Sequence, residues 1–154
     1  MKKLLSAMLA LCMIVSVTAC SNKNESSVPE EVKGSEDRVM RDITTQELIE
    51  DMELGINLGN TFESCGNWIN KSSVTNYETA WGSPVITEQM IKGYKDCGFG
   101  VMRLPVAWSN MMDKETYTIN PDYMARVKEV LNWALDSDLY VILNIHYDNG
   151  WFSG

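Results

Sequence analysis

The sequence predicts an α/β fold in which parallel strands alternate with helices that pack against the sheet. Three short apolar runs are typical of buried strands, and they occupy residues 54–60, 101–104 and 139–145. Two segments between them carry apolar residues at helical spacing, over residues 88–97 and 120–136. Strands that alternate with helices along a chain form parallel sheets through right-handed crossovers.

The first unit begins with a capped helix. Thr44 and Glu47 are three residues apart and form a capping box, which predicts a short helix that ends near Glu53. The apolar run over 54–60 follows as the first strand. We expect a long loop without regular structure over residues 61–86, before the next helix.

The second unit is bounded by residues that start and stop regular structure. Thr87 can cap the helix predicted over 88–97, and Gly98 is a typical helix stop. The strand over 101–104 is expected to end at Pro105, because proline has no N–H to donate to a ladder.

The third unit carries the same kinds of signal. Asn120 can cap a helix, Pro121 suits its first turn, and we expect the helix to end near Asp136. The nearly continuous apolar run over 139–145 indicates a strand that is buried on both faces. Three parallel strands are too few for a closed or doubly wound sheet, so we expect this chain to be the front part of a larger α/β domain.

The first twenty residues look like a secretory signal. Two lysines precede an apolar run over 4–17, which is shorter than the about 20 residues that a membrane-spanning helix needs. Residues 17–20 resemble the bacterial lipobox, which implies removal of residues 1–19, acylation of Cys20, and an exported protein anchored by lipid to the bacterial cell membrane or cell surface. Ordinary cleavage without acylation is one alternative, and a small buried helix is the other.

The composition of residues 20–154 divides them into a linker and a folded part. Residues 20–41 are rich in Ser, Glu, Lys and Asn, which predicts a flexible linker, and residues 42–154 form the folded part. The 154 residues are 45% hydrophobic, which excludes a disordered chain, and carry a formal net charge of −8. The acidic balance argues against a nucleic-acid partner, because an acidic chain would repel the phosphate backbone.

The cysteines of the folded part are too far apart to pair. Cys65 follows the first predicted strand and Cys97 ends the next helix, so they belong to opposite ends of the sheet. A disulfide needs Cα atoms within about 7 Å, and we therefore predict two free thiols. One histidine and two distant cysteines do not make metal-ligand spacing, and there is no glycine-rich phosphate loop. We expect neither a metal nor a cofactor.

Candidate functional residues gather where the predicted strands end, which is the edge at which parallel α/β folds bind ligands. They are Asn60, Arg103, Trp108 and His146. An arginine within an apolar strand must be paired, so a structural salt bridge to a carboxylate is the alternative to a catalytic role for Arg103. A structural role is likewise the alternative for His146, and filling of the space above the sheet is the alternative for Trp108.

Tryptophans are concentrated in the loops that follow the strands, where indole rings suit stacking against sugar rings. These are Trp68, Trp81, Trp108 and Trp151. Glu63 and Glu78 share one long loop, and we do not expect either of them to be the acid or base of a catalytic pair.

Four motifs resemble, in the same order, those of glycoside hydrolase family 5. They are GINLGNTFE at 55–63, ETAWG at 78–82, GFGVMRLPVAW at 98–108 and YVILNIH at 140–146. The resemblance implies a (β/α)8 barrel, of which this chain supplies the first three βα units. The most similar group within the family is the endoglucanases that act on β-1,4-glucans.

The resemblance also implies a mechanism that retains anomeric configuration and uses two glutamates, at the ends of the fourth and seventh strands and thus beyond residue 154. By motif, Arg103 corresponds to the arginine that supports the nucleophile and lowers its pKa, and His146 to the histidine that binds sugar hydroxyls. Trp108 and Asn60 are expected to line the cleft. Many relatives have a second histidine where this chain has Tyr147, which leaves the preferred glucan open.

The sequence thus predicts the N-terminal portion of a lipid-anchored glycosidase whose partners are a β-glucan polysaccharide or oligosaccharide and, through Cys20, a membrane. A non-enzymatic surface lipoprotein that binds glycan through its tryptophans is the first alternative. An inactive truncated product is the second.

Overall fold

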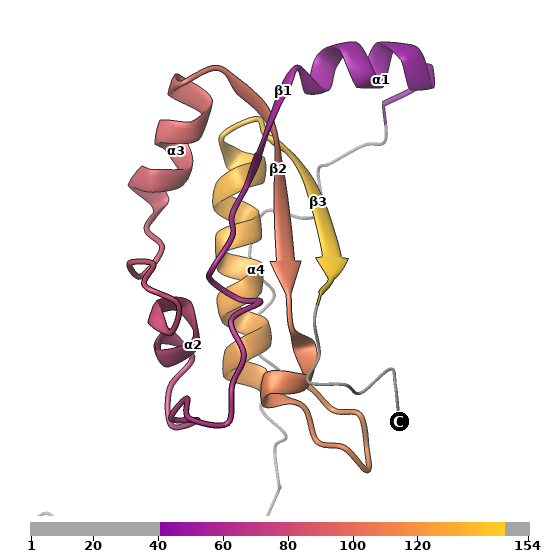
Figure 1. Cartoon of the computed structure of the whole chain (residues 1–154). Coiled ribbons are helices and arrows are strands. Elements are labelled where there is room, and N and C mark those ends of the chain that lie inside the picture. The colour runs from indigo at the N-terminus through magenta and orange to yellow at the C-terminus, as the bar shows by residue number, and fades with distance from the viewer. Residues whose placement is uncertain (1–40, 147–154) are drawn as a thin grey trace, which may run out of the picture. The chain divides into compact units, whose positions relative to one another are not determined.

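A computed structural model of the chain describes residues 41–146 (Figure 1). Its sheet has three parallel strands in the order β1-β2-β3, which are Leu54–Asn57, Phe99–Val106 and Tyr140–Ile145. The helices are α1 Thr45–Met52, α2 Thr75–Thr79, α3 Glu88–Asp96 and α4 Pro121–Asp136, and one 3-10 turn, η1, spans Trp108–Met111. The predicted alternation of strands and helices is confirmed.

The core lies between the sheet and the helices α3 and α4, which pack together along one face of it (Figure 1). Alternate residues of β2 point into this core, where Met102, Leu104 and Val106 are fully buried. They share one hydrophobic cluster with Ile91 of α3 and Val130 of α4. The remaining residues of β2, including an arginine, therefore belong to the opposite face of the sheet.

Local capping chemistry places the helix starts where the sequence predicts them. At α1 the side chain of Thr44 accepts a hydrogen bond from the Glu47 N–H, and the Glu47 carboxylate accepts one from the Thr44 N–H, which completes the capping box. At α3 the side chain of Thr87 accepts a hydrogen bond from the Met90 N–H, and at α4 the side chain of Asn120 accepts from two backbone N–H groups.

The segment 61–86, predicted as a loop, contains the short helix α2. Its start has no side-chain cap, because Val74 stands at that position, so the sequence carries no local signal for it. Tyr77 is buried and donates a hydrogen bond to the Asn110 carbonyl oxygen. Tertiary packing therefore supplies the stability that this one turn lacks by itself.

The prediction that Pro105 ends the second strand is wrong, since β2 continues to Val106. The carbonyl of Arg103 faces β1, where it accepts a hydrogen bond from Leu58, and the nitrogen of Pro105 faces the same way. Strand β1 has already ended at Asn57. Proline donates no ladder hydrogen bond on that side, but Val106 still pairs with β3, which continues the strand.

The third strand was expected to be buried on both faces, and in the described residues it is not. Ile142, Leu143 and Ile145 are 48%, 44% and 55% exposed. Within residues 41–146, β3 pairs only with β2 and lies at the edge of the sheet. Its apolar run is thus consistent with the larger sheet that the sequence predicts.

Some predictions fall elsewhere in the chain. The signal peptide over 1–19, the lipidated Cys20 and the linker up to residue 40 lie outside the described residues, as does Trp151. Among the described residues, no helix combines the length and apolar character that crossing a bilayer requires. Both cysteines of that part, Cys65 and Cys97, are free thiols, as predicted.

Candidate active site

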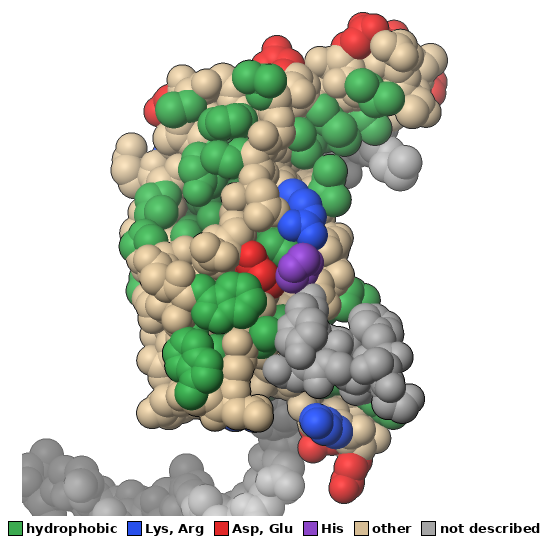
Figure 2. Space-filling view, viewed as in Figure 1, with side chains coloured by type: hydrophobic (Ala, Val, Ile, Leu, Met, Phe, Trp, Pro, Cys, Tyr) green, Lys and Arg blue, Asp and Glu red, His purple; other side chains and the backbone are tan. Residues whose placement is uncertain are grey.

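Two of the predicted site residues meet at the end of the sheet. Nη2 of Arg103 lies 3.1 Å from Nδ1 of His146, which directly follows β3. Nη1 of Arg103 donates to Oδ1 of Asn57, the last residue of β1, at 2.6 Å. Figure 2 shows the histidine beside the arginine on the open face of the molecule. The three side chains thus come from three neighbouring strands.

Strand register is what brings them together. Asn57 and Arg103 are paired positions of β1 and β2, so their side chains leave the sheet on the same face. Val106 is paired with Ile145, and its carbonyl accepts a hydrogen bond from the His146 N–H at 3.0 Å. This bond extends the β2–β3 ladder by one residue and fixes the backbone that carries the imidazole.

The alternative for Arg103, a structural salt bridge to a carboxylate, does not occur among the described residues. The guanidinium meets an amide oxygen and an imidazole nitrogen instead, and it is only partly buried. The reason is positional, because neither β1 nor β3 places an acidic residue opposite Arg103. Its positive charge therefore remains available to an anion at the strand ends.

The turn after β1 holds Asn60 by its backbone. Asn60 adopts a left-handed conformation, with φ of 58°, and its side chain is exposed. Its N–H donates to Glu63 at 2.6 Å, and the N–H of Thr61 donates to the other oxygen of the same carboxylate at 3.0 Å. Glu63 is only 5% exposed, so its carboxylate acts as an internal clamp for this turn. No hydrogen bond joins Asn60 to Arg103 or His146.

Trp108 stands in η1, directly after β2, and is partly buried. Its ring meets the buried Tyr123 edge-on, with centroids 6.1 Å apart. The hydroxyl of Tyr123 donates to the Phe62 carbonyl oxygen at 2.8 Å, and burial raises the pKa of that hydroxyl far above its ordinary value. The contact with Tyr123 therefore supports the Trp108 ring, which makes no hydrogen bond to Arg103 or His146. By contrast, Trp68 and Trp81 are exposed.

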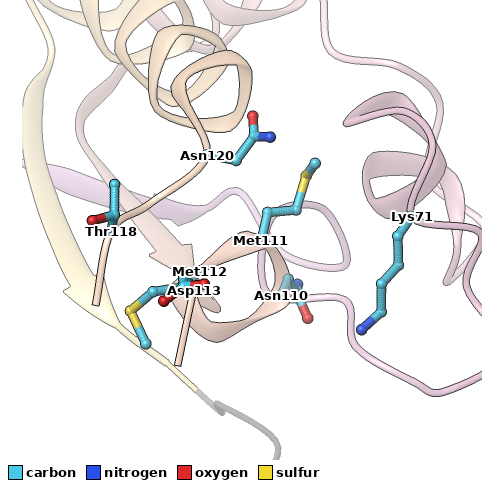
Figure 3. A pocket seen from close by; sticks show the side chains of 7 residues that line it. All are labelled: Lys71, Asn110, Met111, Met112, Asp113, Thr118 and Asn120. Carbon is cyan, nitrogen blue, oxygen red and sulfur yellow. The ribbon is translucent and has the colours of Figure 1, made fainter. Parts of the chain in front are cut away.

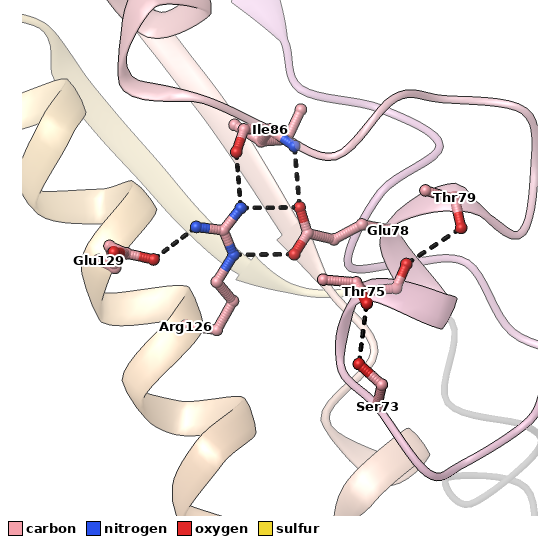
Figure 4. A network of polar contacts seen from close by, with 7 residues as sticks. All are labelled: Ser73, Thr75, Glu78, Thr79, Ile86, Arg126 and Glu129. Atoms are coloured by element: carbon pink, nitrogen blue, oxygen red, sulfur yellow. Dashed lines mark hydrogen bonds and ion pairs between the residues drawn. The ribbon is translucent and has the colours of Figure 1, made fainter.

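Glu78 belongs to a polar network between the α2 segment and α4 (Figure 4). Its fully buried carboxylate forms two hydrogen bonds with Arg126, at 2.8 and 3.0 Å, and accepts a third from the Ile86 N–H at 2.9 Å. Arg126 also bonds Glu129 and lies over the ring of Trp133, 5.1 Å from its centroid. The hydrogen bond to Glu78 raises the pKa of Arg126. This carboxylate is a structural anchor.

A hollow of about 360 Å³ opens beside the chain that leaves β2 (Figure 3). It is lined by Lys71, Asn110, Met111, Met112, Asp113, Thr118 and Asn120. The Asp113 carboxylate accepts hydrogen bonds from its own loop, chiefly from Thr116, and these hold its pKa below the ordinary value. The Asp113 carboxylate is therefore occupied by its own loop. In the described part of the chain, no three His, Cys, Asp or Glu side chains gather as they would around a metal.

Sequence reasoning missed Asn57. The only signal was a polar residue at the end of an apolar run, and its importance depends on a strand register that a single sequence does not reveal. The clamp role of Glu63 was also missed, although its place three residues after Asn60 is a spacing at which a side chain can cap a turn.

Comparison with known proteins identifies a family. The family model described as Cellulase (glycosyl hydrolase family 5) matches residues 62–154. The chain is 39% identical over 113 residues to endoglucanase B of Clostridium cellulovorans, which covers 73% of this chain and 23% of that protein. It is 42% identical over 117 residues to a xyloglucan-specific endo-beta-1,4-glucanase of Bacteroides ovatus, covering 74% of this chain and 23% of that protein.

Solved structures of the same family also match this chain. A GH5-4 broad specificity endoglucanase from Ruminococcus champanellensis with bound cellotriose matches with a TM-score of 0.67 and 40% identity, over 73% of this chain and 33% of that chain. A GH5 family lichenase from Caldicellulosiruptor matches with a TM-score of 0.65 and 36% identity, over 72% of this chain and 30% of that chain. The chain thus spans about a quarter to a third of these relatives. It belongs to glycoside hydrolase family 5, and its three parallel strands with their helices form part of that family's (β/α)8 barrel.

Proposed function

We propose that this chain is the N-terminal part of the catalytic domain of a retaining endo-β-1,4-glucanase. The observation that carries the proposal is the contact of Arg103 with His146 at the strand ends, in a chain that belongs to a cellulase family. Retaining glycosidases use two carboxyl groups about 5–5.5 Å apart, one as nucleophile and one as acid/base. In this family both are glutamates at the ends of the fourth and seventh strands, which we place beyond residue 154.

Arg103 acts through its charge. Among the described residues its guanidinium contacts Asn57 and His146 and no carboxylate, so no local ion pair offsets the charge. A cation within about 4–6 Å of a carboxylate lowers the pKa of that carboxylate and keeps it ionised. An ionised nucleophile is the form that attacks the anomeric carbon, so Arg103 supports the first step of the reaction.

His146, Trp108 and Asn60 contact the sugar. The exposed imidazole can exchange hydrogen bonds with sugar hydroxyls, and the partly buried indole offers a flat apolar face. Two relatives are named as an endoglucanase and a xyloglucan-specific glucanase, and a third as a lichenase, which supports a β-glucan as the substrate. Either a polysaccharide or an oligosaccharide fits this proposal.

Hydrolysis of a soluble cellulose derivative tests the proposal. The gene is read beyond codon 154, and the longer product is compared with the 154-residue chain in a reducing-sugar assay. We expect hydrolysis by the longer product and none by the shorter one, because the shorter one lacks both glutamates. Activity of the 154-residue chain above a mock control would contradict this division, as would inactivity of a folded longer product on every β-glucan.

A glycan-binding protein without catalysis is the second candidate, favoured by the exposure of Trp68 at 68% and Trp81 at 42%. Indoles on a surface can stack on sugar rings without a complete barrel. Titration of the chain with cello-oligosaccharide, followed by tryptophan fluorescence, separates the two. Saturable quenching without hydrolysis by any longer product would favour binding alone.

We further propose export and lipid anchoring at Cys20, on the lipobox-like residues 17–20. Expression in a bacterial host, followed by mass spectrometry of the N-terminal peptide, should give an acylated Cys20 in the membrane fraction. Cys20→Ala should remove both the acyl mass and the membrane association. Wild-type chain in the soluble fraction with an unmodified Cys20 would overturn the proposal.

A further inference from the structure

Three side chains are in contact at the strand ends: Asn57, Arg103 and His146. Of these, only Asn57 has a side chain that neither carries a charge nor titrates. We propose that Asn57 is a positioning residue, which holds Arg103 and through it fixes His146 in the tautomer that carries its proton on Nε2. The use of that tautomer for substrate binding rests on the proposed function. The positioning itself does not, and it can be measured without catalysis.

Donor and acceptor chemistry determines the orientation of each group. A guanidinium has only N–H donors, so both of its partners must accept. The partner on Asn57 is therefore the amide oxygen, at 2.6 Å, and the partner on His146 is an unprotonated Nδ1, at 3.1 Å. A neutral imidazole that accepts at Nδ1 has its proton on Nε2. His146 is exposed, and its Nε2 makes no hydrogen bond to the described residues, so this N–H is free to donate to a ligand oxygen.

The turn after β1 comes close to the exposed amide of Asn57. A Cβ on Gly59 would lie 2.6 Å from Nδ2 of Asn57 and 3.4 Å from Oε1 of Glu63, so the glycine lets the turn close onto this amide. The buried Glu63 carboxylate holds that turn by two backbone N–H groups. Leu58 donates to the Arg103 carbonyl at 3.0 Å, which keeps the two strands in register next to the side-chain contact.

The arginine needs this support because its side chain is long. A free arginine side chain samples many rotamers, and a single contact to a histidine ring does not define the plane of its guanidinium. Two acceptors on opposite sides of the fork, one from β1 and one after β3, define it. Removing Asn57 should therefore release the guanidinium and, with it, the contact to Nδ1.

His146 is the only histidine of the chain, so one imidazole spectrum reports on the site. The imidazole ¹⁵N shifts of the 154-residue chain are recorded well above the ordinary histidine pKa of about 6.5, in the folded state and in urea. We expect the ¹⁵N shift of Nδ1 in the folded chain to differ clearly from its shift in urea. The difference should be in the direction of a nitrogen that accepts a hydrogen bond. Asn57→Ala should lose most of that difference, whereas Asn57→Asp, which keeps an acceptor, should retain it. Asn132→Ala, on α4, is the matched control and should match the wild type.

Two further variants keep the test decisive if Asn57→Ala fails to fold. Gly59→Ala pushes against the Asn57 amide and should lose the same shift difference. Arg103→Ala should lose it as well, and adding Asn57→Ala to Arg103→Ala should change nothing more. The inference is overturned if Asn57→Ala or Gly59→Ala folds with unchanged His146 shifts, or if Asn57→Ala acts equally when Arg103 is already alanine. An inactive longer product with intact shifts would instead refute only the proposed function.

Discussion

Replacing Arg126 with alanine would leave the Glu78 carboxylate in the interior without its counter-ion. The Glu78 side chain is fully buried, and the guanidinium supplies two of its three hydrogen bonds. The same guanidinium also donates to the Ile86 carbonyl oxygen at 2.6 Å. The substitution therefore removes a charge and orphans two acceptors at one place.

The expected loss of unfolding free energy follows from this geometry. Removing one partner of a buried ion pair costs about 3–5 kcal/mol. Glu78 keeps the hydrogen bond from the Ile86 N–H, and the Arg126 side chain is 16% exposed, so we expect the lower end, about 3 kcal/mol. That is a large share of the about 5–15 kcal/mol that stabilises a typical domain.

Urea unfolding followed by tryptophan fluorescence measures the loss. With a slope of about 1–3 kcal/mol/M, the midpoint should fall by about 1–3 M. Lys128→Ala removes an exposed cation from the same helix and should stay within about 0.5 kcal/mol of the wild type. The double variant Glu78→Leu with Arg126→Met should recover most of the stability, because it leaves no buried charge.

A loss for Arg126→Ala that equals the loss for Lys128→Ala would refute this reasoning. It would mean that water reaches Glu78 and solvates it as well as the guanidinium does. Equal unfolding free energies for the wild type, Arg126→Ala and the double variant would likewise be incompatible with a buried ion pair.

Three further predictions concern other parts of the fold. Gly100→Ala should cost about 1–3 kcal/mol in the same urea experiment, because its new Cβ would collide with backbone atoms at the end of α1. Iodoacetamide at neutral pH should modify the exposed Cys97 before Cys65 in peptide mass mapping, since burial raises the pKa of Cys65 and lowers its thiolate fraction; equal rates would contradict this. Hydrogen bonds from Thr116 lower the pKa of Asp113, so its stabilising effect is present above the ordinary aspartate pKa of about 3.9 and is lost as the pH falls through the lowered value. Carboxyl ¹³C NMR should show Asp113 titrating below that ordinary value, and an unshifted titration would be incompatible with these bonds.

Local chemistry made much of the fold predictable. Thr44, Thr87 and Asn120 each cap a helix through neighbours two or three residues away, and such signals are complete within a short window. The parallel pairing of the strands followed from their alternation with helices. The convergence of Arg103 and His146 followed from the same topology, because parallel strands end at one edge.

What depends on distant partners was not predictable from a single sequence. The α2 turn has no cap and is held by Tyr77, whose partner lies 33 residues away. The pairing of Glu78 with Arg126 joins positions 48 residues apart. The contact of Asn57 with Arg103 depends on an exact strand register, which the apolar runs do not fix to within one residue.

The most direct test of the central claim is the kcat of the longer gene product on a soluble β-1,4-glucan, with and without Arg103→Ala. We expect a loss of about 100-fold or more in kcat with an unchanged unfolding midpoint, as for removal of a fixed electrostatic group from an active site. Arg103 would then be a working part of a family 5 active site to which this chain contributes three strands. A folded Arg103→Ala enzyme with wild-type kcat would show that the Arg103 charge does not support the nucleophile.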